Sequence, residues 1–442
     1  LLMINDFRGF YDFGLISGMG LWIIFIVYFV FLPSLLIFLE KIRLLRIQPL
    51  PTEKEHPLKF KKSWMKPSLI VMALLTLFSF GAAPFLKFEF DSKKIRADIP
   101  EVRLAKQKQR MTIHRVNNPA AVVIYSREEA DALTEAVEEK IQQDKISPTL
   151  DTSRSYYDLV PPDQGAKLKV LAQIRKLLSD PTIKLVKGEQ KVKLDHFKAI
   201  LAEAKAVDPK EVPSEVTDLF RGKPQIPGQL FYINAIPQLE LDDGANAMRF
   251  ADDIATLKTK KGTYYPASDA VVFGLVLSTM LRDSKKVLII SLFSIAFFVF
   301  LDFRDWKKSG IVLLSIVLGV LWLLGIMWLF KIKFNFYNII IIPAVMGMSI
   351  DNSIHIYHRY EELGRGSLQK VLSSTGVAAM LASLTNASGF FGLLFCTHRG
   401  LYSIGLLAVI GVATCLISTL VFLPMLLQFL EHIQYDRKPV TP

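Results

Sequence analysis

The feature that most constrains this chain of 442 residues is a series of long apolar runs. A helix needs about 20 apolar residues to cross a hydrocarbon core, because each residue adds about 1.5 Å of rise. We place the spans at 13–38, 67–86, 287–303, 309–330, 336–357, 371–396 and 401–427. The third run is the shortest, but an apolar lead-in precedes it. The sequence therefore predicts a polytopic α-helical membrane bundle of about six to seven spans.

Basic residues indicate how these spans are oriented. Lys and Arg resist translocation, so short loops rich in them stay on the cytoplasmic side. The densest basic segment, 41–66, lies between the first two spans, which makes it a cytoplasmic linker. Threading onward places the tail 432–442 on the same side and the long polar region 87–284 on the opposite side. The formal charge of +12 is explained by topology and contact with membrane lipids, so we expect no nucleic-acid partner.

The polar region 87–284 is predicted to be an α+β domain. Ser126 and Glu129 form a capping-box pattern, which predicts a helix that runs to about Lys145. Strands are predicted at 120–125, 154–160 and 229–235, and helices near 165–179, 193–206 and 245–257. The region has no metal-ligand cluster, Walker loop or nucleophile elbow. We therefore predict that the protein is not an enzyme and holds no metal or other bound cofactor.

An internal repeat divides the chain. Residues 8–42 match residues 399–433 at a constant offset of 391, with 17 identities in 35 positions. The identities include Pro33 with Pro424 and Glu40 with Glu431, which shared apolar composition does not explain. The first span then corresponds to the last span of a repeat. We expect a missing N-terminal half of the same protein to precede it.

The predicted organisation follows from these boundaries. Residues 285–431 form a five-helix transmembrane bundle, and the extracytoplasmic domain is placed between it and the second span. In chain order the segments are 1–40, the last helix of a first repeat; 41–66, the linker; 67–86, a transmembrane helix; 87–284, the α+β domain; 285–431, the bundle; and 432–442, the cytoplasmic tail.

One acidic residue, Asp351, lies inside the fifth span. A carboxylate in the bilayer is costly, normally faces the bundle interior and marks an ion or proton path by default. His355 follows four residues later and shares its helix face. A proton relay is the favoured interpretation, and a static Asp351–His355 pair that fixes helix packing is the alternative. The coupling ion would be a proton.

The sixth span supplies candidate partners for this carboxylate. Thr385 and Asn386 are predicted to hydrogen-bond it across the helix interface, whereas Ser383 and Ser388 fit small-residue packing equally well. Three glycines are predicted to allow close helix approach, namely Gly347, Gly376 and Gly389.

These motifs carry a family resemblance. Gly347-x-x-x-Asp351 with its Ile-His-x-x-x-Arg continuation resembles the resistance-nodulation-division superfamily, and most of all the branch of the mycobacterial membrane protein large (MmpL) and hopanoid transporters. The segment 383–394 is similar to that family's penultimate helix. The resemblance implies that Asp351 is a relay carboxylate faced by Thr385. It also implies a porter-like domain of split β-α-β units and lipid or other hydrophobic substrates that leave as protons enter.

The resemblance has one departure, because members of the MmpL branch usually have Tyr where this chain has Asn352. We include Asn352 in the predicted relay, although the main relay carboxylate could lie in the missing half. The resulting hypothesis is a proton-driven lipid exporter of the bacterial inner membrane, with the domain 87–284 in the periplasm. The alternative is a lipid-sensing or sterol-sensing receptor or scaffold of the same fold. Substrate identity, a homo-oligomer and a periplasmic partner stay open.

Overall fold

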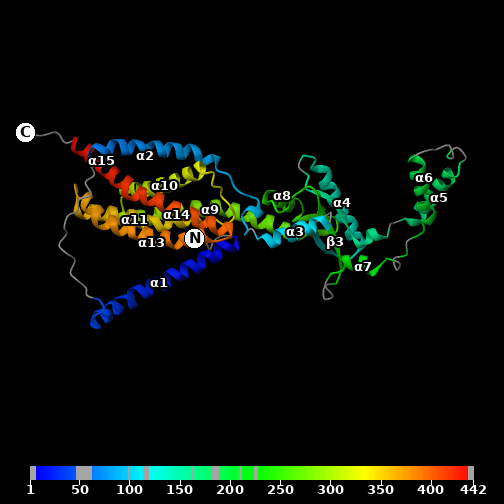
Figure 1. Cartoon of the computed structure of the whole chain (residues 1–442), viewed down its shortest axis with the longest axis horizontal. Coiled ribbons are helices and arrows are strands. Elements are labelled where there is room, and N and C mark those ends of the chain that lie inside the picture. Colours follow the sequence, from blue (N-terminus) through cyan, green and yellow to red (C-terminus); the bar gives the residue numbers. More distant parts are fainter. Residues whose placement is uncertain are drawn as a thin grey trace, which may run out of the picture. The chain divides into compact units, whose positions relative to one another are not determined.

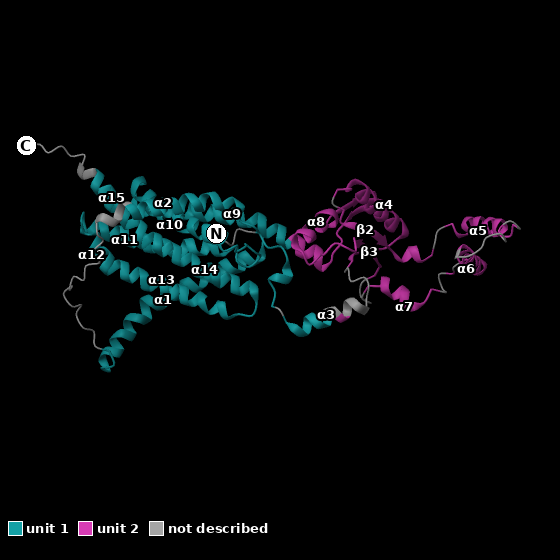
Figure 2. Ribbon diagram, turned by 45° about the horizontal axis from the view of Figure 1, so that its top comes forward, with its two compact units in different colours: residues 1–107, 276–442 teal, residues 108–275 magenta. Residues whose placement is uncertain are grey.

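The computed structural model describes residues 6–45, 62–97, 99–112, 119–146, 148–160, 163–180, 183, 189–206, 208, 212–222 and 227–436. Most of the predicted linker 41–66 and the end of the predicted tail 432–442 lie outside these residues. The chain divides into two compact units, which Figure 2 distinguishes by colour. Unit 1 comprises Leu1–Gln107 and Val276–Pro442, and unit 2 comprises Lys108–Leu275.

Unit 1 is a bundle of long helices (Figure 1). Its helices are α1 (Arg8–Lys41), α2 (Lys62–Ala82), the part of α9 (Asp269–Phe303) from Val276 onward, α10 (Trp306–Leu329), α11 (Ile341–Leu363), α12 (Leu368–Val371), α13 (Val377–Phe391), α14 (Arg399–Ile417) and α15 (Leu423–Asp436). Two π-helical turns connect neighbours: η8 (Leu372–Gly376) joins α12 to α13, and η10 (Ser418–Phe422) joins α14 to α15. Short 3-10 turns follow α2 (η2, Ala83–Phe85) and α13 (η9, Gly392–Phe395).

Six helical segments among the described residues are long and apolar enough to cross a membrane. They are Arg8–Lys41, Pro67–Phe85, Asp269–Phe303, Trp306–Leu329, Leu368–Phe395 and Arg399–Ile433. The helix α11 corresponds to the predicted span 336–357, but its polar residues, Asp351 and His355 among them, keep it out of this set. The chain is a multi-pass membrane protein.

The bundle is organised around α10 and α14. Helix α10 packs against α2, α11 and α14, and α14 also packs against α11 and α13. Buried Leu323, Val345 and Leu407 join these helices in one core. Gly411 allows α14 to approach α11, since a Cβ added there would lie 3.0 Å from Cγ2 of Val345. By contrast, Phe10 is the buried residue of α1.

The N-terminal end of α1 is attached to α9. The backbone amide of Phe7 donates a hydrogen bond to Oδ2 of Asp283 over 3.0 Å. Arg282 forms an ion pair with Asp6, also at 3.0 Å. The Phe7 ring meets Phe336 edge-on, with 5.8 Å between ring centroids. Within the described residues, α1 is therefore held at one end.

Unit 2 contains a three-stranded antiparallel sheet of order β1-β3-β2. Its strands are β1 (Ala120–Ile124), β2 (Leu150–Arg154) and β3 (Gln229–Ala235), and helix α4 (Arg127–Gln143) connects the outer two. Because β3 lies between β1 and β2 and runs opposite to both, the connection is a split β-α-β unit. Side chains from the sheet, α4 and α8 (Gly244–Ile254) form its core, including Ile124, Leu133 and Phe231.

Most predicted elements of this unit are confirmed, and one strand is wrong. Ser126 accepts a hydrogen bond from the amide of Glu129, whose carboxylate accepts from the amide of Tyr125, so the capping box opens α4 as predicted. The strand predicted at 154–160 lies earlier, at Leu150–Arg154. A second capping box, between Ser155 and Asp158, turns the following residues into the 3-10 turn η4 (Tyr156–Leu159).

The remaining elements of unit 2 are helical or short. Helices α5 (Gln164–Leu178) and α6 (Glu189–Glu203) match the predicted helical stretches and pack against each other. Arg175 of α5 donates to the carbonyl oxygens of Leu201 and Ala204, which caps the end of α6. Helices α3 (Pro100–Thr112) and α7 (Ser214–Thr217) and a hairpin of β4 (Leu257–Thr259) with β5 (Gly262–Tyr264) complete the unit, the first residues of α3 being assigned to unit 1.

Candidate functional site

Helix α11 carries the predicted relay and presents two chemically different faces. Gly347, Asp351 and His355 follow one another at four-residue spacing, and all three are exposed in the described structure. Asn352 and Ser353, on another face, are buried in the bundle. The sequence predicted that the Asp351 carboxylate faces the bundle interior. In the structure it does not, because Asn352 and Ser353 occupy the interior positions.

The structure does not form a static pair between Asp351 and His355. No hydrogen bond or ion pair joins their side chains among the described residues. A carboxylate and an imidazole on a membrane helix need water, a polar partner or a covering helix, since hydrocarbon solvates neither. The face of α11 that carries Asp351 and His355 therefore lacks such a partner among the described residues.

Asn352 connects α11 to α13. Its side-chain amide donates a 2.9 Å hydrogen bond to Oγ of Ser383, and both side chains are buried. The predicted partners are placed differently, since the Thr385 hydroxyl donates to the carbonyl of Leu381 on its own helix and Asn386 is exposed. Ser383 therefore makes the hydrogen bond between α11 and α13, and its partner is Asn352 and not the Asp351 carboxylate.

A buried chain of hydroxyl groups on α10, α11 and η10 was missed by the sequence analysis. Ser353 Oγ lies 2.9 Å from Ser315 Oγ and 2.8 Å from Thr419 Oγ1. Ser418 donates to the backbone carbonyl of Ser315 at 2.5 Å. Hydroxyl groups that interrupt apolar spans were the available signal, because such groups hydrogen-bond across helices. These hydrogen bonds fix the register of the relay helix α11 against α10 and η10.

Two of the three glycines that were predicted to allow close helix packing do not do so in the structure. A Cβ added at Gly347 or Gly389 would meet no described neighbour within 4 Å, so neither glycine mediates a close helix contact. A Cβ at Gly376 would lie 3.5 Å from Leu420, in ordinary contact with η10. Helices α10 and α14 approach each other closely at Gly319, where an added Cβ would lie 2.7 Å from the Cα of Cys415.

Paired charges surround the end of the bundle where α11 finishes. His358 Nε2 lies 2.6 Å from Oδ2 of Asp302, and Lys308 pairs with Glu361. The Tyr360 hydroxyl donates to Oε1 of Glu431 over 2.6 Å, and the amide of Gly366 donates to the same oxygen over 3.1 Å. These acids have partners, unlike Asp351.

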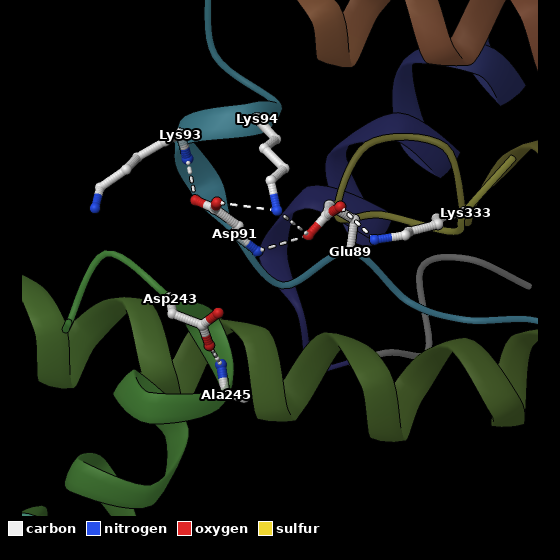
Figure 3. A network of polar contacts seen from close by, with 7 residues as sticks. All are labelled: Glu89, Asp91, Lys93, Lys94, Asp243, Ala245 and Lys333. Atoms are coloured by element: carbon white, nitrogen blue, oxygen red, sulfur yellow. Dashed lines mark hydrogen bonds and ion pairs between the residues drawn. The ribbon is translucent and has the colours of Figure 1, made fainter. Parts of the chain in front are cut away.

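A second polar cluster, which we call the clasp, lies where α11 begins (Figure 3). Glu89, in the segment after α2, forms a 2.7 Å ion pair with Lys333 in the α10–α11 turn. Its amide donates to the carbonyl of Phe334 over 2.7 Å, and Lys94, in the 3-10 turn η3 (Ser92–Lys94), lies 3.7 Å from its other oxygen. Burial raises the pKa of Glu89, but hydrogen bonds from Lys333 and the Asp91 amide, with the charges of Lys333 and Lys94, outweigh it and hold that pKa below its usual value.

Comparison with known proteins identifies relatives of part of the chain. Residues 254–432 match the family described as protein export membrane protein SecD/SecF, C-terminal. A membrane protein of Methanocaldococcus jannaschii, MJ1562, is 22% identical over 202 residues, which cover 43% of this chain and 52% of the relative. The chain is thus a multi-pass membrane protein whose C-terminal part is similar to a protein-export family.

Two solved structures share a distant likeness with the chain. One is a heavy metal efflux pump, with a TM-score of 0.44 and 13% identity, covering 86% of this chain and 50% of the pump. The other is SecDF, a translocon-associated membrane protein from Thermus thermophilus, with a TM-score of 0.39 and 15% identity, covering 88% and 40%. The chain spans about half the length of the relatives that it matches. The MmpL branch that its motifs resemble stays a prediction.

Proposed function

We propose that this protein is a proton-driven transporter in which Asp351 takes up and releases the coupling proton. The observation that carries the proposal is the exposed face of α11, where Asp351 and His355 lie without a hydrogen-bonded partner among the described residues. In hydrocarbon, a carboxylate on such a face has a strong tendency to be neutral, and it becomes charged when water or a cation reaches it. That alternation is what a proton carrier requires.

The exposed face also supports the proposal that more helices cover it in the complete transporter. The internal repeat places a copy of α14–α15 at α1, so a first set of helices would precede α1 as part of the same protein. A second acid on those helices would share the proton path. Asn352 and Ser383 would then hold α11 against α13 while the Asp351 face moves against the covering helices.

The energy available is sufficient for such a cycle. A membrane potential of ~200 mV supplies roughly 4 to 5 kcal/mol for each proton that crosses. Protonation of Asp351 would remove a charge from α11, and the hydroxyl chain from Ser353 to Ser315 and Thr419 would transmit the movement to α10 and η10. One or two protons per cycle suffice for a conformational exchange of a few kcal/mol.

We propose lipids or other hydrophobic molecules as substrates, exported from the inner membrane of a bacterium through a periplasmic domain. The motif resemblance and the lipid-facing bundle support this choice. A second candidate is mechanical work on a polypeptide during export, which the match of residues 254–432 to the SecD/SecF family favours. A lipid-sensing receptor of the same fold would need no proton cycle, so proton coupling separates it from both transport functions.

The test is Asp351→Asn in the whole protein, reconstituted into proteoliposomes with a pH-sensitive dye inside. We expect proton flux through the variant to fall at least tenfold, because the amide cannot carry a proton. A tenfold fall corresponds to an activation free energy that is higher by about 1.4 kcal/mol. Asp302→Asn is the matched control, since Asp302 is an acid of the same bundle that already has a partner in His358. Equal proton flux in Asp351→Asn and the wild type would remove Asp351 from the mechanism.

A further inference from the structure

A groove lies between α2 and α10 on a different part of the bundle from Asp351. The two helices touch at Ser79 and Gly325, where a Cβ added to the glycine would lie 2.8 Å from the Cβ of Ser79. One turn away, Trp322 Nε1 donates a 3.0 Å hydrogen bond to Oγ1 of Thr76. Thr76 also lines an open groove of about 380 Å³, which extends along α2 on both sides of this bond, from Leu69 to Phe80. The hydrogen bond therefore lies part of the way along the groove.

The walls of the groove are almost entirely apolar. Leu318 lines it from α10 and Phe422 from η10, and the apolar residues that line it from α2 are Leu69, Met72, Ala73, Leu77 and Phe80. Thr76 supplies the polar atom, but its hydroxyl proton is already donated to the carbonyl of Met72 over 2.7 Å. The lining thus offers no side-chain donor to a polar ligand, and it fits a hydrocarbon.

The location of the groove determines which hydrocarbon is available. Both Pro67–Phe85 and Trp306–Leu329 are long and apolar enough to cross a membrane, and Thr76 and Leu318 lie near the middle of these segments. The groove therefore opens into the bilayer core, where acyl chains are the solvent. Its volume falls in the range of ~300 to 1,000 Å³ that is typical of small-ligand sites. Two turns of a helix about 10 Å wide would occupy more than twice 380 Å³, so the groove is too small for a helix.

We propose that this groove is a binding site for one acyl chain of a membrane phospholipid. The acyl chain lies along α2 and passes Thr76, and the Phe422 ring covers its side. Phe422 ends the π-helical turn that begins with Ser418 and Thr419, which bond to α10 and α11. An occupied groove supports that turn from the lipid side. The site stands whether or not Asp351 carries protons.

The test uses the full chain in nanodiscs of phosphatidylethanolamine and phosphatidylglycerol, a fraction of which carries a diazirine in one acyl chain. After illumination, labelled residues are found by peptide mass spectrometry. Because lipid tails are as apolar as the groove, the preference comes from packing alone, and we expect labelling at Met72 and Leu318 to exceed that at Val71 by about fivefold. Uniform labelling of all lipid-facing residues of α2 would show ordinary bilayer contact and overturn the proposal.

Two matched variants decide whether the groove itself is responsible. Ala73→Trp fills the groove, whereas Val71→Trp adds the same side chain on the opposite, exposed side of α2. We expect Leu318 labelling to fall about fivefold, back to the bilayer level, in the first variant and to stay unchanged in the second. If Ala73→Trp does not fold, Leu318→Phe reduces the same space, and Met72 labelling is measured instead. Labelling that survives the filling variant, or that both tryptophan variants abolish, contradicts the site.

Discussion

Two helical segments of this protein share a sequence but not an environment. Helix α1 and the segment α14–η10–α15 align without a gap, with 17 identities in 35 positions. None of the apolar stretch of α1 is buried, whereas half of that of α14–α15 is. Leu407 is fully buried, and its counterpart Ile16 is 71% exposed. Similar apolar helices thus differ because α10, α11 and α13 cover only one of them.

The differences between the two copies follow the contacts that each makes. Ser418 and Thr419 bond to α10 and α11, and their counterparts in α1 are Val27 and Tyr28, which cannot reproduce this pair of hydroxyl contacts. The residues that both copies keep include Gly411 with Gly20 and Glu431 with Glu40. Apolar composition therefore places a helix in the membrane, whereas a few small and polar residues select its partners.

The largest effect is expected from filling the close contact at Gly411. Gly411→Leu places a side chain where a Cβ alone would lie 3.0 Å from Val345, so we expect it to destabilise the bundle by about 3 kcal/mol. Gly20→Leu is the matched control, since a Cβ at Gly20 meets nothing within 4 Å. Thermal unfolding in detergent measures both variants. An equal loss of stability would mean that α1 is packed as tightly as α14.

A smaller effect is expected from shortening a buried leucine. Leu423→Ala leaves a cavity at a fully buried position of α15, and we expect a cost of about 2 kcal/mol, near the low end for such changes. The low end applies because lipid solvates leucine and alanine similarly, so the hydrophobic contribution is small. The cost then comes mainly from lost packing contacts. Leu32→Ala, at the equivalent but only half-buried position of α1, should cost less, about 0.5 kcal/mol. Urea-induced or heat-induced unfolding measures both variants. An equal loss of stability would show that the leucine of α1 is packed as tightly as that of α15.

The sequence predicts the helices well and their side-chain contacts poorly. Long apolar runs determine spans because the bilayer thickness sets their length, and the capping box at Ser126 determines the start of α4. The strand at Leu150–Arg154 was misplaced because the capping box of Ser155 and Asp158 was not recognised. Periodicity shows that Asp351 and His355 share a face, but not that this face lies outside the bundle.

The relay neighbours show why the rest could not be predicted. Thr385 and Ser383 are two residues apart on α13, and only the rotation of that helix decides which of them meets α11. Gly347 and Gly319 are equally small, and only the crossing point of two helices makes one of them necessary. The rotation of a helix and the crossing point of two helices both depend on contacts between segments that are far apart in the sequence. Gly405 and Gly411 have glycine counterparts in the first repeat copy, and both lie at close contacts, so the shared glycines were a local signal of crossing points.

A modest effect is expected at the shared glutamates. Glu431→Ala removes the acceptor of the Tyr360 hydroxyl and the Gly366 amide, and we expect a loss of about 1.5 kcal/mol. Glu40→Ala should leave the unfolding of this chain unchanged, because Glu40 is exposed. In a longer protein that includes a first repeat, Glu40→Ala should cost as much as Glu431→Ala. An unchanged stability there would show that the first copy does not use its glutamate as the second one does.

The smallest effect concerns the clasp, which holds the start of α11. The pKa of Glu89 is lowered in the folded protein from an ordinary value of 4.5. Its contribution is therefore fully present above about pH 4.5 and is lost as the pH falls through the lower, folded-state pKa. We expect Glu89→Gln to cost less than about 1 kcal/mol at pH 7, because the Lys333 partner is largely exposed.

The pH dependence distinguishes this ion pair from simple packing. The stability difference between wild type and Glu89→Gln should be constant from about pH 6 to 8 and shrink below about pH 4.5, since protonated Glu89 resembles glutamine. Asp12→Asn provides a control on α1, where the carboxylate pairs with Arg8 at an exposed site and holds no other segment. A difference for Glu89→Gln that persists unchanged at pH 3 would assign the effect to the shape of the side chain. In that case the backbone contact between Glu89 and Phe334, which the variant retains, would be what fixes the start of α11.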